Sequence, residues 1–363
     1  MEKVKAVLLA VLVVGYGACF CSCEEPKEEM GSVGFVGSQE SEDSFFESLV
    51  IDETSEELEA VGGSGISTDV ESDDLESSRY FNVVALGDSI ARGYGLRKPE
   101  TECFPRLLTD MIGERLGLKA GYLNYAVDGH KTSDLLNLLE SGAVIGINEA
   151  DLVVLCIGAN NILTVFTDTM MSFFEKNDLK AFDFINGRLA LTNELINESV
   201  GLDDDSESME SIESFFTELN ALLVSEEFET KMRQGIMDLK TELPKVLNSV
   251  FDKNPEVSVA LMTLYNPFEG FSFGIQYIDA SLDLESLAAK WVEMLNVEIA
   301  SVIENFTNTV LVDTYAPFDL TGDKLINAGF SSMPLKLSVD PHPNAEGHRF
   351  IAQLYFERIK QMY

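Results

Sequence analysis

The stretch Tyr80-Phe-Asn-Val-Val-Ala-Leu-Gly87-Asp88-Ser89-Ile90 decides the fold class of this chain. Its first seven residues form an apolar, β-branched run of the kind that makes a buried strand. Gly87 ends the run, and a serine follows at a strand-to-helix turn. The start of a helix offers an N–H group without an intrahelical acceptor and the positive end of a dipole. This turn therefore exposes a hydroxyl group beside a place that favours negative charge.

Strand and helix patterns alternate over the rest of the chain. Four further apolar runs predict strands, at residues 122–126, 151–157, 257–264 and 309–313. Helical spacing is found at residues 103–116, 131–141, 291–303 and 345–362. Continuous apolar strands that alternate with helices indicate a parallel sheet covered on both faces. We therefore predict a single α/β domain over residues 80–363, with a five-stranded parallel sheet.

One connection, from about residue 162 to residue 250, is too long for a loop of a compact domain. It carries no strand signal, whereas Phe215, Leu219, Leu222 and Leu223 recur at helical spacing. We interpret it as an inserted helical cap. The pattern fits a fixed cap and a mobile lid equally well.

The charge of the chain is strongly negative, at −37 for 363 residues. Phosphate binding needs clustered Lys and Arg, so this balance argues against a nucleic-acid partner. It also argues against docking on anionic lipid through a polybasic face. Residues 24–78 hold thirteen Glu and five Asp against Lys27, a net charge of −17. Such a segment repels itself and buries little surface, which predicts a disordered acidic tether over residues 19–79.

The N-terminal residues 1–18 are typical of a signal peptide. Lys3 and Lys5 precede an apolar run, residues 6–14, that is too short to cross a bilayer. Gly17-Ala18-Cys19 then resembles a bacterial lipobox, in which the cysteine is lipidated, although Tyr16 stands where such boxes usually have Leu. We expect an exported protein, either anchored through Cys19 on the outer face of the membrane or secreted after cleavage near Gly17.

Chemically useful residues follow the strands, where open α/β sheets place their ligand sites. Ser89 follows the first strand, Gly129 the second and Asn160 the third, and His342 precedes the last helix. In this order the residues resemble the SGNH (GDSL-type) hydrolase family, apart from the inserted cap. The resemblance implies a flavodoxin-like α/β/α fold and ester hydrolysis through an acyl-enzyme. It implies no cofactor and no metal.

Site roles are carried over from the resemblance by position. Ser89 would be the nucleophile and His342 its general base. The oxyanion hole would consist of the backbone N–H groups of Ser89 and Gly129 with the side chain of Asn160. A serine needs an imidazole to take its proton, and a tetrahedral oxyanion needs fixed donors, so the chemistry agrees with these residue types.

The chain departs from the family pattern before the histidine. The family acid usually precedes the histidine by three residues, and Val339 stands there. Asp340, one residue closer, would then orient His342. A backbone carbonyl could do so instead, or the enzyme could use a Ser–His dyad. A second departure is Asn161, where Asp is frequent.

Three classes of function remain open at this stage. The first is a serine esterase acting on short acyl esters, with O-acetylated carbohydrate or a small lipid ester as substrate. The second is a catalytically inactive surface protein of the same fold that binds a glycan or a protein partner. In the third, the acidic tether and the cap are the functional parts, which predicts divalent-cation-dependent adhesion and no turnover. Each would contact the membrane only through a lipid anchor.

Overall fold

A computed structural model describes residues 80–176, 182–185, 188–191, 214, 217–268, 272–275, 280–321, 325–327, 329–332 and 335–363. The predicted signal peptide, Cys19 and the acidic tether of residues 19–79 lie outside these residues, as does Phe215 of the predicted cap. Those assignments remain predictions. Within the described ranges, no helix combines the length and the apolar composition that a bilayer crossing requires.

Five parallel strands form the central sheet, in the order β2-β1-β3-β6-β9. Their bounds are β1 (Tyr80–Gly87), β2 (Lys119–Asn124), β3 (Leu152–Cys156), β6 (Ser258–Met262) and β9 (Thr309–Val312). All five predicted strands are confirmed. The chain first builds outward from β1 to β2 and then reverses through β3 to β9. Such a reversal leaves a crevice at the carboxyl ends of β1 and β3, because the connections after these strands diverge.

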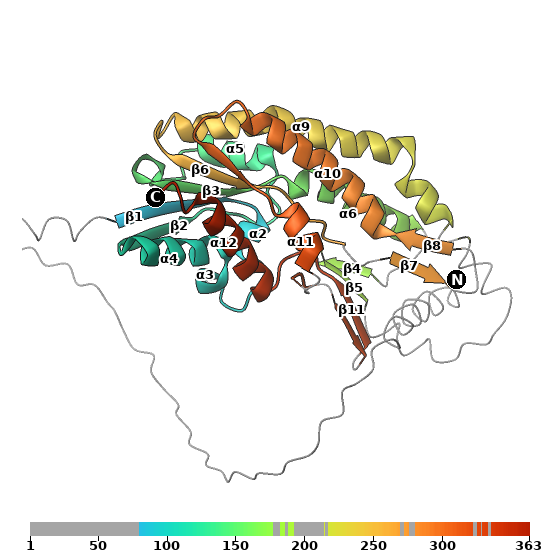
Figure 1. Cartoon of the computed structure of the whole chain (residues 1–363). Coiled ribbons are helices and arrows are strands. Elements are labelled where there is room, and N and C mark those ends of the chain that lie inside the picture. Colours follow the sequence, from blue (N-terminus) through green and yellow to red (C-terminus); the bar gives the residue numbers. More distant parts are fainter. Residues whose placement is uncertain are drawn as a thin grey trace, which may run out of the picture.

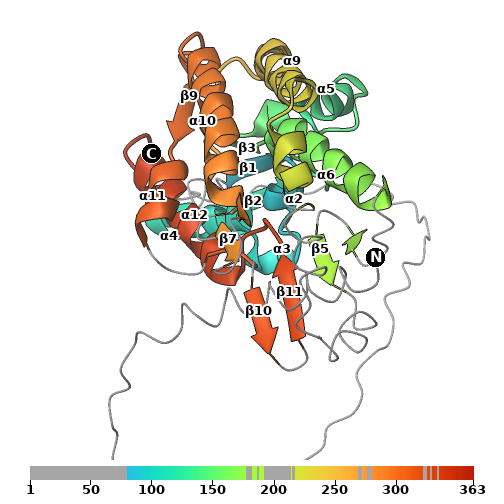
Figure 2. The ribbon, with the colours of Figure 1, turned by 90° about the vertical axis from the view of Figure 1, so that its right-hand side faces the viewer.

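Helices cover both faces of this sheet, which gives the predicted three layers (Figures 1 and 2). One layer contains α4 (Phe104–Leu116) and α12 (Ala345–Ile359), which pack against each other. The opposite layer contains α5 (Thr132–Glu140), α6 (Ala159–Lys176), α9 (Glu226–Phe251) and α10 (Leu284–Ile303). In that layer α9 is central, because it contacts α5, α6 and α10.

Alternation along the strands divides the core into two clusters. In β1, Val84 and Leu86 point into the cluster under α9, whereas Phe81 and Val83 point into the cluster under α4 and α12. Successive side chains of a strand lie on opposite faces, so an uninterrupted apolar run supplies both clusters at once. This explains why the strands read as continuous apolar segments in the sequence.

The inserted connection is helical at both ends, and it also contains strands that the sequence did not indicate. Helix α6 leads into it, residues 217–223 are helical, and α9 leads back to the sheet. Ser225 caps α9 by accepting a hydrogen bond from the N–H of Phe228 (3.2 Å), and three glutamates occupy the first turn. Both features stabilise a helix start. Buried Leu219 and Leu223 of the 217–223 segment join the core.

The unpredicted strands are β4 (Phe182–Ile185) and β5 (Arg188–Leu191). They join β11 (Leu335–Val339) and β10 (Gly329–Ser332) in a four-stranded antiparallel sheet. A hairpin of β7 (Ser272–Ile275) and β8 (Ala280–Asp283) precedes α10. The pairing of β5 with β11 joins segments that lie far apart in the sequence, and each of these strands has only four or five residues. Local patterns of that length carry little strand signal.

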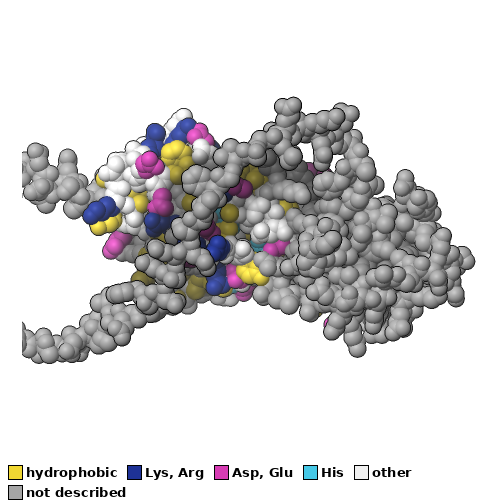
Figure 3. Space-filling model, turned by 90° about the horizontal axis from the view of Figure 1, so that it is seen from below, with side chains coloured by type: hydrophobic (Ala, Val, Ile, Leu, Met, Phe, Trp, Pro, Cys, Tyr) yellow, Lys and Arg dark blue, Asp and Glu magenta, His cyan; other side chains and the backbone are white. Residues whose placement is uncertain are grey.

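Short helices complete the described chain. They are α2 (Ser89–Arg92), α3 (Pro99–Glu102), η3 (Ile147–Glu149) and α11 (Tyr315–Thr321). On the face seen in Figure 3, the basic and acidic side chains of the described residues are interspersed. The described part of this face thus lacks the single-sign basic surface that a polyanion would need.

Candidate active site

The turn after β1 is built around Gly87. Its φ of 143° is rare for residues with a side chain, and a Cβ there would lie 1.9 Å from the carbonyl oxygen of Cys156. The next residue, Asp88, donates its N–H to that carbonyl (3.0 Å) and accepts the N–H of Ile90 at Oδ1 (3.0 Å). Asp88 therefore caps α2, and Ser89 is the first residue of the helix.

Ser89 lies next to His342, a residue 253 positions later in the chain. His342 Nε2 is 2.9 Å from Ser89 Oγ, and His342 Nδ1 is 2.6 Å from Asp340 Oδ1. All three side chains are buried. An ionised carboxylate only accepts hydrogen bonds, so this arrangement places the imidazole proton on Nδ1 and leaves Nε2 to accept the serine hydroxyl.

The two-residue spacing between Asp340 and His342 works because the loop folds back on itself. Asp340 Oδ1 also accepts the backbone N–H of His342 (3.2 Å), which brings the carboxylate to the near side of the ring. The hydroxyl of Tyr265, just after β6, donates to the carbonyl of Pro341 (2.7 Å). Asn344 then caps α12 by accepting the N–H of Gly347 (2.9 Å). The loop is thus held at both ends.

Gly129 and Asn160 line one pocket with Ser89 and His342. Gly129 has a φ of 78°, and the space where its Cβ would be is empty to 4 Å. The Asn160 side chain donates one hydrogen bond to the carbonyl of His130 (3.0 Å). An amide nitrogen carries two hydrogens, so the second remains for a ligand. The structure therefore brings together all five residues predicted for the site.

Asn161 stabilises the segment that follows Gly129. Its Oδ1 accepts the N–H of Thr132 (3.2 Å), and its Nδ2 donates to the Thr132 hydroxyl (3.0 Å) and to the carbonyl of Gly235 (3.3 Å). The Thr132 hydroxyl donates in turn to Glu242 of α9 (2.5 Å). Asn160 and Asn161 thus hold the 130–132 segment. The carboxylate of this hydrogen-bond network belongs to Glu242 of α9, whereas the family frequently has an Asp at position 161.

Two residues of the site had no role assigned from the sequence. Tyr94 packs on the imidazole of His342, with ring centroids 4.5 Å apart. Tyr265 anchors the loop of the histidine as described above. Both follow strand ends closely in the chain, and that position was the available clue. Arg92, also near this turn, pairs with Asp128 at 2.8 Å on the partly exposed rim.

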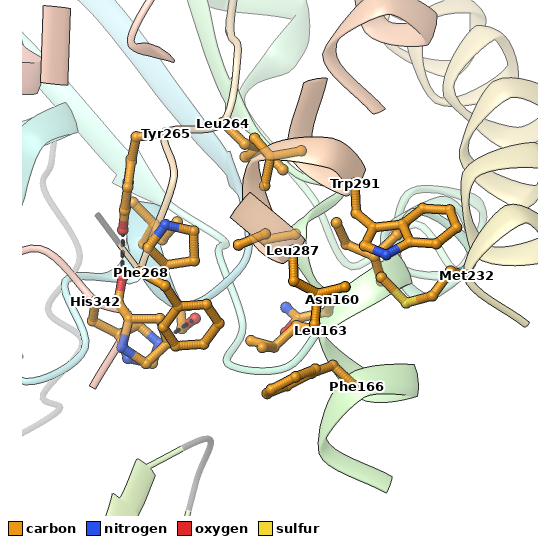
Figure 4. A pocket seen from close by; sticks show the side chains of 18 residues that line it. Asn160, Leu163, Phe166, Met232, Leu264, Tyr265, Phe268, Leu287, Trp291 and His342 are labelled. Atoms are coloured by element: carbon orange, nitrogen blue, oxygen red, sulfur yellow. Dashed lines mark hydrogen bonds between the residues drawn. The ribbon is translucent and has the colours of Figure 1, made fainter. Parts of the chain in front are cut away.

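Two pockets meet at Ser89, His342, Asn160 and Leu163, which line both. The first, called the apolar pocket, has a volume of about 90 Å³ and runs between α6, α9 and α10. Its walls are mainly aliphatic and aromatic and include Phe166, Met232, Phe268, Leu287 and Trp291 (Figure 4). The second, called the polar pocket, has a volume of about 240 Å³ and adds Tyr94, Asp128, Gly129, Thr164 and Thr167.

Two other buried ionisable groups lie near the site without contacting the serine hydroxyl. Burial raises the pKa of Asp88 from 3.8 to about 7, and its Oδ2 has no hydrogen-bond partner among the described residues. Burial also lowers the pKa of His348, in the first turn of α12, from 6.5 to about 3. His348 Nδ1 accepts the N–H of Phe104 (3.2 Å). Both groups hold backbone in place. Among the described residues, no cluster of His, Cys, Asp and Glu suits a metal ion.

Comparison with known proteins identifies one family. The sequence pattern of the GDSL-like lipase/acylhydrolase family matches residues 85–350. Curated protein sequences give no match. Similar solved structures include the lipase Lip_vut3 from a goat rumen metagenome, with 18% identity and a TM-score of 0.45 over 76% of this chain and 95% of its own. An extracellular lipase from Streptomyces rimosus has 16% identity and a TM-score of 0.45, covering 77% and 99% of the two chains. Phospholipase A1 from Streptomyces albidoflavus NA297 gives the same four values.

Proposed function

The chain belongs to the GDSL-like lipase/acylhydrolase family and is an ester hydrolase. From that premise we propose that it hydrolyses short acyl esters through an acyl-enzyme formed on Ser89. The observation that carries the proposal is the continuous contact from Asp340 through His342 to the Ser89 hydroxyl, with distances of 2.6 and 2.9 Å.

In the acylation step, Ser89 Oγ attacks the ester carbonyl carbon while its proton passes to His342 Nε2. Asp340 holds the imidazole in the required tautomer and stabilises the imidazolium that forms. When the tetrahedral intermediate collapses, the bond to the alcohol oxygen breaks and the alcohol leaves with the proton from His342. The acyl group stays on Ser89 as an ester.

In the deacylation step, a water molecule attacks the acyl carbon and gives a proton to His342 Nε2. Collapse of the second intermediate releases the carboxylic acid, and Ser89 recovers its proton from His342. In both intermediates the oxyanion would receive hydrogen bonds from the N–H groups of Ser89 and Gly129 and from the Asn160 amide. Donors of this kind each contribute roughly 10²–10³ in rate.

The proposed substrates are O-acetylated carbohydrates or small lipid esters. The proposed location is outside the cytoplasmic membrane, with the domain either anchored through a lipid on Cys19 or secreted. This rests on the apolar run of residues 6–14 and the small residues before Cys19.

The test is hydrolysis of p-nitrophenyl acetate by the purified chain and by a Ser89→Ala variant. We expect turnover by the parent and a loss of at least about 10⁴-fold in the variant. Thr109→Ser, a change of another buried hydroxyl residue in α4, serves as the control and should keep activity. Full activity of Ser89→Ala would show that another group is the nucleophile.

A further inference from the structure

Two pockets of different chemistry open onto one serine hydroxyl, and this pairing constrains the substrate. Resting on the proposed nucleophile, we infer that the apolar pocket holds the acyl chain and the polar pocket holds a hydroxyl-bearing alcohol. The substrate would then be an ester of a short aliphatic acid, longer than acetate, with an alcohol such as glycerol or a sugar. This selects the small lipid ester, or a longer-chain acylated sugar, over an O-acetyl group.

The apolar pocket fits a hydrocarbon chain because its walls offer almost no polar partner beyond the reacting groups. Leu163 and Phe166 come from α6, and Leu287 and Trp291 from α10. In Figure 4 the side chains of Leu163, Phe166 and Leu287 lie between His342 at one end and Trp291 with Met232 at the other. A chain in this space exchanges water for carbon contacts, which is favourable in proportion to the apolar area covered. An acetyl group would leave most of this wall uncovered.

The far end of the apolar pocket is formed by buried side chains that pack in the core. Trp291 is 2% exposed, packs edge-on against Phe228 of α9 with centroids 6.2 Å apart, and has Lys290 over its ring at 4.6 Å. Met232 is 3% exposed and belongs to the same core. A floor held by core packing sets a maximum chain length. We therefore infer a short-chain optimum with a fall for long chains.

The polar pocket offers hydrogen-bonding groups to the alcohol. Asp128 Oδ2 accepts a hydrogen bond from Arg92 (2.8 Å) and has a further lone pair for a ligand, whereas its Oδ1 is buried with no hydrogen-bond partner among the described residues. The hydroxyls of Thr164 and Thr167 donate to backbone carbonyls (2.8 and 3.1 Å) and keep their acceptor lone pairs. A carboxylate and two hydroxyl oxygens suit an alcohol that carries further hydroxyl groups.

The acyl side is tested with p-nitrophenyl acetate, butanoate, hexanoate, octanoate and dodecanoate, using kcat/KM for each. For the parent, kcat/KM should be higher for the butanoate, hexanoate and octanoate esters than for the acetate and dodecanoate esters. Ala288→Leu fills the apolar pocket and should lower the octanoate-to-acetate ratio about tenfold or more, and Leu287→Ala should shift the optimum to longer chains. Ala289→Leu, the next residue of α10 and not a lining residue, is the matched control and should leave the ratio unchanged.

The alcohol side is tested with glyceryl monohexanoate against methyl hexanoate, following acid release. Asp128→Asn should lower the glycerol-to-methyl ratio several-fold. Asp110→Asn, which alters another surface Asp–Arg pair (2.7 Å) on α4, should not change it. Hexyl acetate identifies the reverse arrangement.

Several outcomes would overturn the inference while leaving Ser89 as the nucleophile. One is a kcat/KM that is highest for acetate and keeps this optimum in Ala288→Leu and Leu287→Ala, with both variants unfolding at the same temperature as the parent. Another is hydrolysis of hexyl acetate faster than methyl hexanoate, with Ala288→Leu affecting only hexyl acetate. Absence of turnover on every ester, with no labelling of Ser89, would instead contradict the proposed function itself.

Discussion

The loop before α12 and the first turn of that helix each contain a buried histidine, and the two differ in their partners. His342 is 6% exposed, and both of its ring nitrogens have side-chain partners, Asp340 at 2.6 Å and Ser89 at 2.9 Å. His348 is fully buried and uses only Nδ1, which accepts a backbone N–H, while its Nε2 has no hydrogen-bond partner among the described residues.

The difference shows that burial alone does not make a general base. His348 is held neutral by an apolar environment between α4 and α12, where it stacks on Phe104 with centroids 6.2 Å apart. His342 has a carboxylate to stabilise its charged form and a hydroxyl to take a proton from. Only the second arrangement can pass a proton back and forth during a reaction.

The largest expected effect separates the two histidines directly. His342→Ala should lower kcat/KM for p-nitrophenyl esters by at least about 10⁴-fold, because Ser89 loses its proton acceptor. His348→Asn, which retains an acceptor near the position of Nδ1, should change kcat/KM only a few-fold. Steady-state kinetics on both variants gives the comparison. Equal losses would mean that His342 acts through the fold and not as a base.

A somewhat smaller loss is expected for Asp340→Asn. An asparagine can still accept the N–H of His342, but it cannot stabilise an imidazolium, so kcat should fall about 10²–10⁴-fold with little change in KM. The measurement is kcat and KM with the preferred ester, supported by circular dichroism of the variant. A variant with parental kcat would favour a Ser–His dyad.

The oxyanion donor should matter less again. Asn160→Ala removes the amide, and kcat should fall about 10²–10³-fold. Because this amide also donates to the His130 carbonyl, Asn160→Ser serves as a partial donor and should recover part of the rate. If Asn160→Ala and Asn160→Ser were equally slow, the amide would be holding the loop rather than the oxyanion.

The contributions of His348 and Asp88 to the free energy of unfolding should depend on pH with opposite signs. His348 has a pKa lowered to about 3, so the folded state resists its protonation and the unfolded state does not. Its contribution is present above pH 6.5 and is lost as the pH falls toward 3. Urea unfolding between pH 4 and 7 should show a weaker pH dependence on the acid side in His348→Asn.

Asp88 is the acidic counterpart of His348, and of the residues discussed its substitution bears least on the comparison of the two histidines. Its pKa is raised to about 7, so its contribution to the free energy of unfolding is greatest below pH 3.8 and is lost as the pH rises to about 7. Asp88→Asn keeps the acceptor for Ile90 and should remove this loss, at about 1.4 kcal/mol per pKa unit. An unchanged pH profile in the variant would show that Asp88 titrates normally.

Much of the parallel sheet and the site could be predicted because both follow from local patterns. Strands β1, β3 and β6 are apolar runs buried on both faces, and parallel strands bring their carboxyl ends to one edge, so Ser89, Gly129 and Asn160 had to meet there. His342 could be placed by its position just before the last helix. The Asp340 contact could not be decided, because it depends on a fold-back of the loop that involves Tyr265, which follows β6.

The four-stranded antiparallel sheet and the two pockets could not be predicted, because each is completed by contacts between segments far apart in the chain. β5 pairs with β11, nearly 150 residues away in the chain, and neither strand is long enough to give a periodic signal. The pockets are formed where α6, α9 and α10 meet, so no single segment reveals that Phe166, Leu287 and Trp291 share one cavity.

The most direct test of the account is covalent labelling of the parent chain with a fluorophosphonate, followed by peptide mass spectrometry. We expect a single adduct on Ser89, formed much more slowly in His342→Ala and absent from Ser89→Ala. A folded parent that takes up no label, or that carries it on another residue, would contradict the claim that Ser89 is the nucleophile.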